Sequence, residues 1–189
     1  MYYKIYTNIR NSAWQCLVDN NIGSLPVDVV KIASKSNIYI KQNSTINDLL
    51  PGEDAKTYFN GKSWIIIYND NNDINISRFA IAHELGHIFL GHEKAFLKYS
   101  NIEEFDKKPK SEEQADRFAL RLLCPACVLK QLGIHSAEEI CDACHIPMSW
   151  AEKRSQRMKK LAKSNKFFTD PLEVKVNENF LEFYKSKNI

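Results

Sequence analysis

The sequence predicts an α+β protein in which a small β-sheet packs on a buried helix and further helices follow toward the C-terminus. Three observations carry this prediction. Two β-rich runs flank an Asn-Gly pair at residues 60–61, an apolar helical pattern follows over 74–90, and helical patterns dominate from residue 112 onward. Asn-Gly between β-rich runs is a strong hairpin signal, and apolar residues three and four apart indicate helices.

Length and composition fit an ordinary globular protein. The chain has 189 residues, 44% hydrophobic and 26% charged, enough for one core with a small helical appendage. We predict a main domain with N-terminal helices over residues 1–130 and a helical extension over 131–189 that packs on it. The net charge of +3 alone indicates neither nucleic acid nor a membrane. Five cysteines without an apolar export segment predict reduced thiols in the cytoplasm, and no apolar run could span a membrane.

The first third of the chain is predicted to hold two helices and one strand. Apolar residues at helical spacing mark the first helix over residues 5–18. Ser24-Leu25-Pro26 is predicted to begin the second helix, because proline is tolerated in a first turn. A strand at 37–41 and a helical turn at 45–50 follow.

The middle of the chain is predicted to form a hairpin and then a buried helix. Strands at 57–59 and 63–68 flank the Asn-Gly pair, and the run of three isoleucines at 65–67 indicates a strand covered on both faces. A helix begins at residue 74 or 77, and Gly91 stops it.

The remainder is predicted to be helical after a polar connection over 92–110. Helices are expected over 112–123, 136–144 and 148–163. A last helix begins at Asp170-Pro171 and places one apolar side along its length, formed by Leu172, Val176, Phe180 and Phe183.

The sharpest pattern is His83-Glu84-Leu85-Gly86-His87. Residues four apart lie on one face of a helix, so the two imidazoles can bind one Zn²⁺ together. Glu84 would lie beside a water on that metal and could accept its proton as the water attacks a carbonyl. The simpler alternative is a pair of hydrogen-bonded core histidines. We favour the metal site, because polar groups inside so apolar a helix need partners.

A third protein ligand is needed if the fourth position is to hold water. The candidates are His92, Glu93, Glu112, Glu113 and His135. The metzincin pattern fails, because Gly91 and His92 do not stand at the spacing that it requires after His87. Five residues along a helix would also turn His92 away from the metal face, so we interpret it as a helix-end residue.

The segment from Ser111 to Asp116 is a better source of the third ligand. Ser111 with Gln114 matches a capping box that begins a helix. Glu112 and Asp116 are four apart, so one carboxylate can bind zinc while the other accepts the N–H of a ligating histidine. A surface acidic first turn, favoured by the helix dipole, is the alternative.

These motifs resemble the ImmA/IrrE-type metallo-endopeptidases, over nearly the whole chain. The resemblance rests on Ala13-Trp14-Gln15-Cys16, the strand at 64–68, Arg78-Phe79, Ala82-His83-Glu84-Leu85-Gly86-His87, Leu90-Gly91-His92, Glu112-x-x-Ala115-Asp116, Leu122-Leu123-Cys124-Pro125 and Asp170-Pro171-Leu172-Glu173. It implies a zincin-like core and one Zn²⁺ per chain, bound by His83, His87 and Glu112. It further implies Glu84 as catalytic base and Asp116 behind a ligating histidine. Glu113 remains a rival to Glu112.

The resemblance also implies a substrate. Such proteins commonly cleave a helix-turn-helix repressor, often encoded beside them on a phage or mobile element, and so act as anti-repressors. The alternative is a non-catalytic, metal-containing regulatory module that binds a transcription factor or DNA through the basic helices at 136–163. Glu84 argues against that alternative, because a purely structural metal site has no use for its carboxylate.

The basic segment at 136–163 has the spacing of a helix-turn-helix, with a turn at 145–147. We favour a helix pair packed on the main domain through Trp150, Met158 and Leu161, with a solvated basic face. Protein recognition comes next, and DNA is the least favoured partner.

Two further patterns stay open. Cys124-x-x-Cys127 and Cys141-x-x-Cys144 invite a second zinc, but both pairs fall in helical patterns and buried thiols are common, so we expect none. The residue that stabilises an oxyanion is not identified by the sequence, although Tyr68, Arg78 and His145 can be considered.

Overall fold

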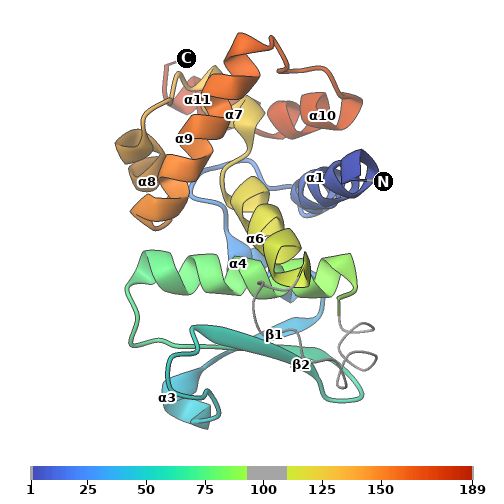
Figure 1. Cartoon of the computed structure of the whole chain (residues 1–189), viewed down its shortest axis with the longest axis vertical. Helices are drawn as coiled ribbons and strands as arrows, with labels where there is room; N and C mark the ends of the chain where they lie inside the picture. Colours follow the sequence, from blue (N-terminus) through green and yellow to red (C-terminus); the bar gives the residue numbers. More distant parts are fainter. Residues whose placement is uncertain (1, 93–109, 189) are drawn as a thin grey trace.

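Three strands form a small mixed sheet at one end of the molecule (Figure 1). The computed structural model describes residues 2–92 and 110–188, with side chains from residue 8 onward. The strands are β1 (Ile38–Gln42), β2 (Ala55–Phe59) and β3 (Trp64–Tyr68). β3 lies in the centre, parallel to β1 and antiparallel to β2. The predicted α+β class is confirmed.

The predicted hairpin is confirmed and has a four-residue connection. Asn60 holds it closed, because its side-chain oxygen accepts hydrogen bonds from the backbone N–H groups of Lys62 and Ser63 at 3.0 and 2.8 Å. Ile66 and Ile67 are both 0% exposed, although successive strand residues point to opposite faces. The prediction that this strand is covered on both faces is therefore also correct.

Helix α4 (Ile74–Leu90) runs across the sheet and separates it from the C-terminal helices (Figure 1). Its first turn is capped by the side chain of Asp73, which accepts from the backbone N–H of Asn75 at 2.8 Å. Its end is set by Gly91, which adopts the left-handed conformation with φ of 68°. The sheet lies on one side of α4 and helical neighbours on the other, which explains why its sequence is apolar on nearly all sides.

Helices α1 (Tyr2–Asp19) and α6 (Lys110–Leu123) pack together on the side of α4 away from the sheet (Figure 1). The predicted face of α1 is confirmed where the structure describes it, because Ile9, Ala13 and Leu17 are at most 1% exposed. These three residues belong to the same hydrophobic core as Phe118 and Leu122 of α6.

The C-terminal helices form the end of the molecule opposite the sheet (Figure 1). They are α7 (Ala126–Gln131), α8 (Ala137–Cys144), α9 (Met148–Lys163), α10 (Pro171–Asn179) and α11 (Leu181–Ser186). Ser136 and Glu139 form a capping box at the start of α8. As favoured, α9 packs inward through Trp150, Met158 and Leu161, and Trp150 stacks on Phe79 of α4 at 4.4 Å. The division at residues 130/131 stays a prediction.

Four local predictions need correction. The second helix, α2 (Val29–Lys35), begins after Asp28 and not at Pro26, because the Asp28 carboxylate caps it by accepting from the N–H of Lys31. The helical turn near the hairpin is α3 (Asn43–Ile46), two residues earlier than expected. Helix α7 was not predicted. The last helix is interrupted at Phe180, which divides α10 from α11.

Candidate active site

His83, Glu84 and His87 lie together on the middle of α4. Each offers a ligand atom, and these atoms lie within 4.8 Å of one another. The two imidazoles meet through their Nε2 atoms, which are 3.0 Å apart. His87 is 5% and Glu84 is 8% exposed, whereas His83 is partly exposed.

Glu112 of α6 completes a triangle with the two histidines. Its carboxylate oxygens lie 3.2 Å from Nε2 of His83 and 3.2 Å from Nε2 of His87. Three ligands around a tetrahedral zinc, with bonds of about 2.0–2.1 Å, would be separated by about 3.3 Å. The observed separations are close to this value: 3.0 Å between the two Nε2 atoms, and 3.2 Å from each of them to a different oxygen of Glu112. The donor set of two nitrogens and one carboxylate also fits a catalytic zinc site.

Gly86 explains why α6 can bring Glu112 so close to α4. A Cβ atom at this glycine would lie 3.1 Å from both Cα and O of Ala115 and 3.2 Å from the ring of Phe118. The missing side chain therefore lets the two helix backbones approach at this crossing. Glu112 stands three residues before Ala115, on the same face of α6, and so reaches the histidines.

The ring of His83 is held by Asp116 from the side away from the triangle. Nδ1 of His83 lies 2.9 Å from Oδ1 of Asp116, which can only accept a hydrogen bond when ionised. The Nδ1–H tautomer leaves the Nε2 lone pair directed at the space between the three ligand atoms. An oriented carboxylate behind a ligating histidine is common in metal sites.

His92 and Gln114 hold the second histidine in an equivalent way. Nε2 of His92 donates to Oε1 of Gln114 at 2.9 Å. Burial lowers the pKa of His92, so its ring is neutral and Nδ1 is an acceptor. That atom lies 3.2 Å from Nδ1 of His87, a contact that fits a His87 ring with a proton on Nδ1. A neutral His87 in this tautomer would offer its Nε2 lone pair to a metal.

The charges of the site support binding of a cation. Burial alone would lower the pKa of His83, but hydrogen bonds with Asp116 and Glu112 outweigh it and raise the value from 6.5 to about 9. Hydrogen bonds with His83 and His87 lower the pKa of Glu112 well below its ordinary range. Without a metal, the protonated ring of His83 therefore donates to two acceptors, Asp116 and Glu112. A dication would replace that proton, since ligating histidines must be neutral.

Glu84 has the environment expected of a proton-transfer group. Burial raises the pKa of its carboxyl, with the nearby histidines opposing the shift. Among the described residues its carboxylate makes no hydrogen bond or ion pair, in contrast to Glu112. A carboxylate with a raised pKa can accept a proton near neutral pH and return it.

Two of the other candidate ligands, Glu113 and His135, are exposed. Glu113 is 53% exposed at its side chain and pairs with Arg117 at 3.3 Å. His135 is exposed, and Glu93 lies outside the described residues. Arg78 is occupied by the backbone oxygens of Val27 and His145, so it does not face the histidines.

Two sequence interpretations change at this site. The capping box of Ser111 and Gln114 is wrong, because α6 already includes Lys110 and the side chain of Gln114 bonds to His92. His92 does follow the end of α4, but it contributes to the site through His87. A buried histidine directly after a helix-ending glycine was the available signal.

The cysteines do not form a second cluster. All five are free thiols, and within residues 2–92 and 110–188 the group that could hold a metal is the one on α4. Burial raises the pKa of Cys127 to about 12, and Cys141 donates to the backbone oxygen of Ile146 at 3.1 Å. Four of the five thiols are buried, and Cys141 is partly exposed.

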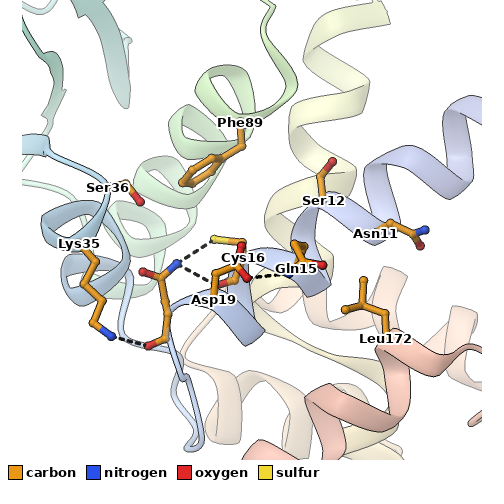
Figure 2. A pocket seen from close by; sticks show the side chains of 10 residues that line it. Asn11, Ser12, Gln15, Cys16, Asp19, Lys35, Ser36, Phe89 and Leu172 are labelled. Carbon is orange, nitrogen blue, oxygen red and sulfur yellow. Dashed lines mark hydrogen bonds between the residues drawn. The ribbon is translucent and has the colours of Figure 1, made fainter.

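A pocket of about 730 Å³ lies between α1, the end of α2, α10 and the last turn of α4 (Figure 2). Phe89 points into it from α4 (Figure 2). Its polar groups largely bond to one another, since Gln15 donates to Asp19 at 2.6 Å and Lys35 to the oxygen of Asn20 at 3.1 Å. The ligand triangle does not line this pocket.

Comparison with known proteins identifies one family. Peptidase_M78, described as the IrrE N-terminal-like domain, matches residues 38–146, more than half of the chain. This stretch contains the whole sheet, α4 and α6, and therefore every residue of the candidate site. No curated protein matches the chain. No helix in the described ranges is long and apolar enough to cross a membrane.

Proposed function

The chain belongs to the peptidase family described by the IrrE N-terminal-like domain, and we propose that it is a zinc-dependent endopeptidase that cleaves a helix-turn-helix transcriptional repressor. One observation carries the proposal for the metal. His83, His87 and Glu112 converge from two helices, with 3.0 Å between the two Nε2 atoms and 3.2 Å from each to a carboxylate oxygen, so all three could bind one ion. One Zn²⁺ per chain would be held there.

Zinc bound by these residues would polarise the scissile carbonyl and lower the pKa of the attacking water toward ~7. Glu84 lies one residue past His83, so its carboxylate can take the proton of that water and then deliver it to the leaving amide nitrogen. Asp116 and His92 keep the two imidazoles oriented throughout, because their hydrogen bonds fix the tautomers.

The proposed substrate follows from the family resemblance, since such proteins commonly cleave a repressor encoded beside them. The cytoplasm is the proposed location, because all five thiols are free. Direct DNA binding through α9 is not favoured, since its inner face is used against the rest of the protein and a single basic helix is a weak DNA signal.

The test is to incubate the purified chain with the repressor encoded beside it and to identify fragments by mass spectrometry. Glu84→Gln removes the proton acceptor and leaves the ligand triangle intact, so we expect full zinc content and loss of cleavage by at least about 100-fold. Glu113→Gln is the matched control, because it makes the same chemical change on an exposed residue.

Normal cleavage by Glu84→Gln would refute the mechanism. Wild-type protein that binds the repressor tightly but leaves it full length, with zinc bound, would favour the non-catalytic regulatory module. Absence of zinc from wild-type protein in native mass spectrometry, even after incubation with Zn²⁺, would refute the metal site itself.

A further inference from the structure

The pocket of about 730 Å³ beside α1 has the size of a site for a small molecule. Ligand pockets commonly enclose about 300–1,000 Å³. Its walls come from α1, the end of α2, the last turn of α4 and α10 (Figure 2). No residue of the ligand triangle lines this pocket, so what it binds does not depend on zinc or on peptide cleavage.

An unused hydrogen-bond acceptor belongs to the lining. Asn20 is 6% exposed, and its side-chain N–H donates to the backbone oxygen of Cys16 at 2.8 Å, which fixes the orientation of the amide. The side-chain oxygen of Asn20 accepts no hydrogen bond from the described residues, and it is not one of the side-chain atoms sealed from solvent. A nearly buried acceptor without a donor is unfavourable, so a ligand that places an N–H or O–H group there would be stabilised.

The ring of Phe89 gives the pocket a flat apolar wall. It points into the pocket from the last turn of α4 (Figure 2). Phe118 of α6 stacks on the same ring, with the two centroids 5.9 Å apart and 28° between the planes. Because Phe89 is partly exposed where it lines the pocket, a planar ring that enters could continue this stack.

The charges of the lining balance. Lys35 contributes one positive charge and Asp19 one negative charge, and the other residues of the lining are uncharged. The hydroxyl groups of Ser12 and Ser36 make no hydrogen bond to the described part of the chain, and the two serines lie to either side of Phe89 in Figure 2. Each hydroxyl can donate and accept. The lining therefore suits an uncharged ligand with several polar groups better than an anion or a cation.

We propose that this pocket binds a nucleoside whose base carries an exocyclic amino group. One such molecule supplies a flat ring for Phe89, a donor for the side-chain oxygen of Asn20 and ribose hydroxyls for the two serines. The amino group distinguishes adenine and cytosine from hypoxanthine and uracil, which carry an oxygen at the same position. The balanced charge of the lining favours the nucleoside over its phosphate.

Isothermal titration calorimetry of the full chain tests the proposal with two matched pairs of probes. Adenosine is compared with inosine, and cytidine with uridine, since each pair exchanges an amino group for an oxygen. We expect the amino-bearing member of at least one pair to bind at least about tenfold tighter, because the other member would set an acceptor against the oxygen of Asn20. Adenosine monophosphate is the fifth probe, and we expect it to bind no tighter than adenosine.

Two pairs of variants locate the binding. Ser36→Trp fills the pocket, whereas Ser34→Trp places the same side chain on an exposed position of α2 outside it. Phe89→Leu removes the stacking ring, and Phe59→Leu makes the same change on a half-exposed residue of β2. We expect nucleoside binding to weaken at least about tenfold in each pocket variant and to change about twofold or less in each control.

Four results would overturn the proposal. These are no binding tighter than about 1 mM by any of the four nucleosides, equal affinity within both pairs, binding that the pocket variants leave unchanged, and adenosine monophosphate bound more than about tenfold tighter than adenosine. Circular dichroism checks the fold of each variant. If Phe89→Leu unfolds, Ser36→Trp carries the test, because Ser36 is partly exposed at the end of α2.

Discussion

Replacing His92 by leucine is expected to weaken zinc binding although His92 does not face the metal position. In the wild-type chain its Nδ1 lies 3.2 Å from Nδ1 of His87, where it can accept a hydrogen bond and so favour a proton on Nδ1 of His87. Leucine offers no acceptor, so the His87 ring would lose both its orientation and the preference for the tautomer with a free Nε2. The side chain that replaces His92 is apolar and of similar size, which limits the damage to the surrounding packing.

The magnitude follows from the position of His92 behind a ligand. Loss of such a partner typically lowers metal affinity about 10–100-fold, which corresponds to about 1.4–2.7 kcal/mol. Gln114→Leu should have a smaller effect in the same direction, because Gln114 acts on His87 only through His92. Gln114→Glu keeps an acceptor for Nε2–H and is expected to retain most of the affinity.

Competition with a chromophoric zinc chelator measures these affinities without any need for a substrate. His135→Leu is the matched control, since it removes an exposed histidine remote from the triangle. If His92→Leu folds and still binds zinc within about twofold of the wild-type affinity, the argument from the hydrogen bonds of His92 is wrong.

Three further predictions concern stability and pH. Gly86→Ala should lower the melting temperature and the zinc affinity together, because its Cβ would lie 3.1 Å from Ala115; unchanged values would contradict the proposed role of the close crossing. After zinc removal, the pKa of His83 is raised to about 9, so its contribution to stability is complete below its unfolded value of 6.5 and is lost as pH rises through about 9. Urea unfolding at several pH values should show this loss in the free energy of unfolding, and the loss should be smaller in Asp116→Asn. An equal loss in Asp116→Asn would rule out the His83–Asp116 pair as its cause. Ser136→Ala removes a capping box and should lower the free energy of unfolding by about 1 kcal/mol, as measured in urea, whereas no change would mean that the cap is redundant.

The features that could be predicted from the sequence are those that local chemistry decides. His83 and His87 share a face because four residues make about one helical turn. Gly91 ends α4 because a positive φ of 68° is open to glycine at no steric penalty. The hairpin likewise needs only Asn60 and its neighbours, whose hydrogen bonds are all within the turn.

The role of His92 could not be predicted by counting residues along a helix. Counting from His87 to His92 is valid only while α4 continues, but the left-handed conformation of Gly91 ends the helix and redirects the chain. The backbone N–H of His92 then bonds to the oxygen of His87 at 3.0 Å, and its ring returns to the same side. Gln114 was misread for a related reason. Its spacing from Ser111 matches a capping box, yet its side chain bonds to His92, which follows the end of α4.

The second helix shows the limit of a single-residue signal. Proline suits the first turn of a helix, but it equally suits the turn before one. Asp28, two residues after Pro26, offers a carboxylate that can bond to the free N–H of Lys31, at 2.8 Å. A side chain that satisfies an otherwise unpaired donor is the stronger determinant of where a helix begins, and here it outweighed the proline.

The choice between Glu112 and Glu113 depends on the rotation of α6 about its own axis. Neighbouring helical residues point about 100° apart, so both carboxylates cannot face α4. The side that faces α4 is the one that carries Ala115, because the backbones of α4 and α6 approach closely where Gly86 meets Ala115. Because Ala115 faces α4, Glu112, three residues before it, faces α4 as well. Glu113 then turns toward solvent and Arg117. A packing contact between two small residues thus selects which acid faces the histidines, and that contact cannot be read from the spacing of the acids along α6.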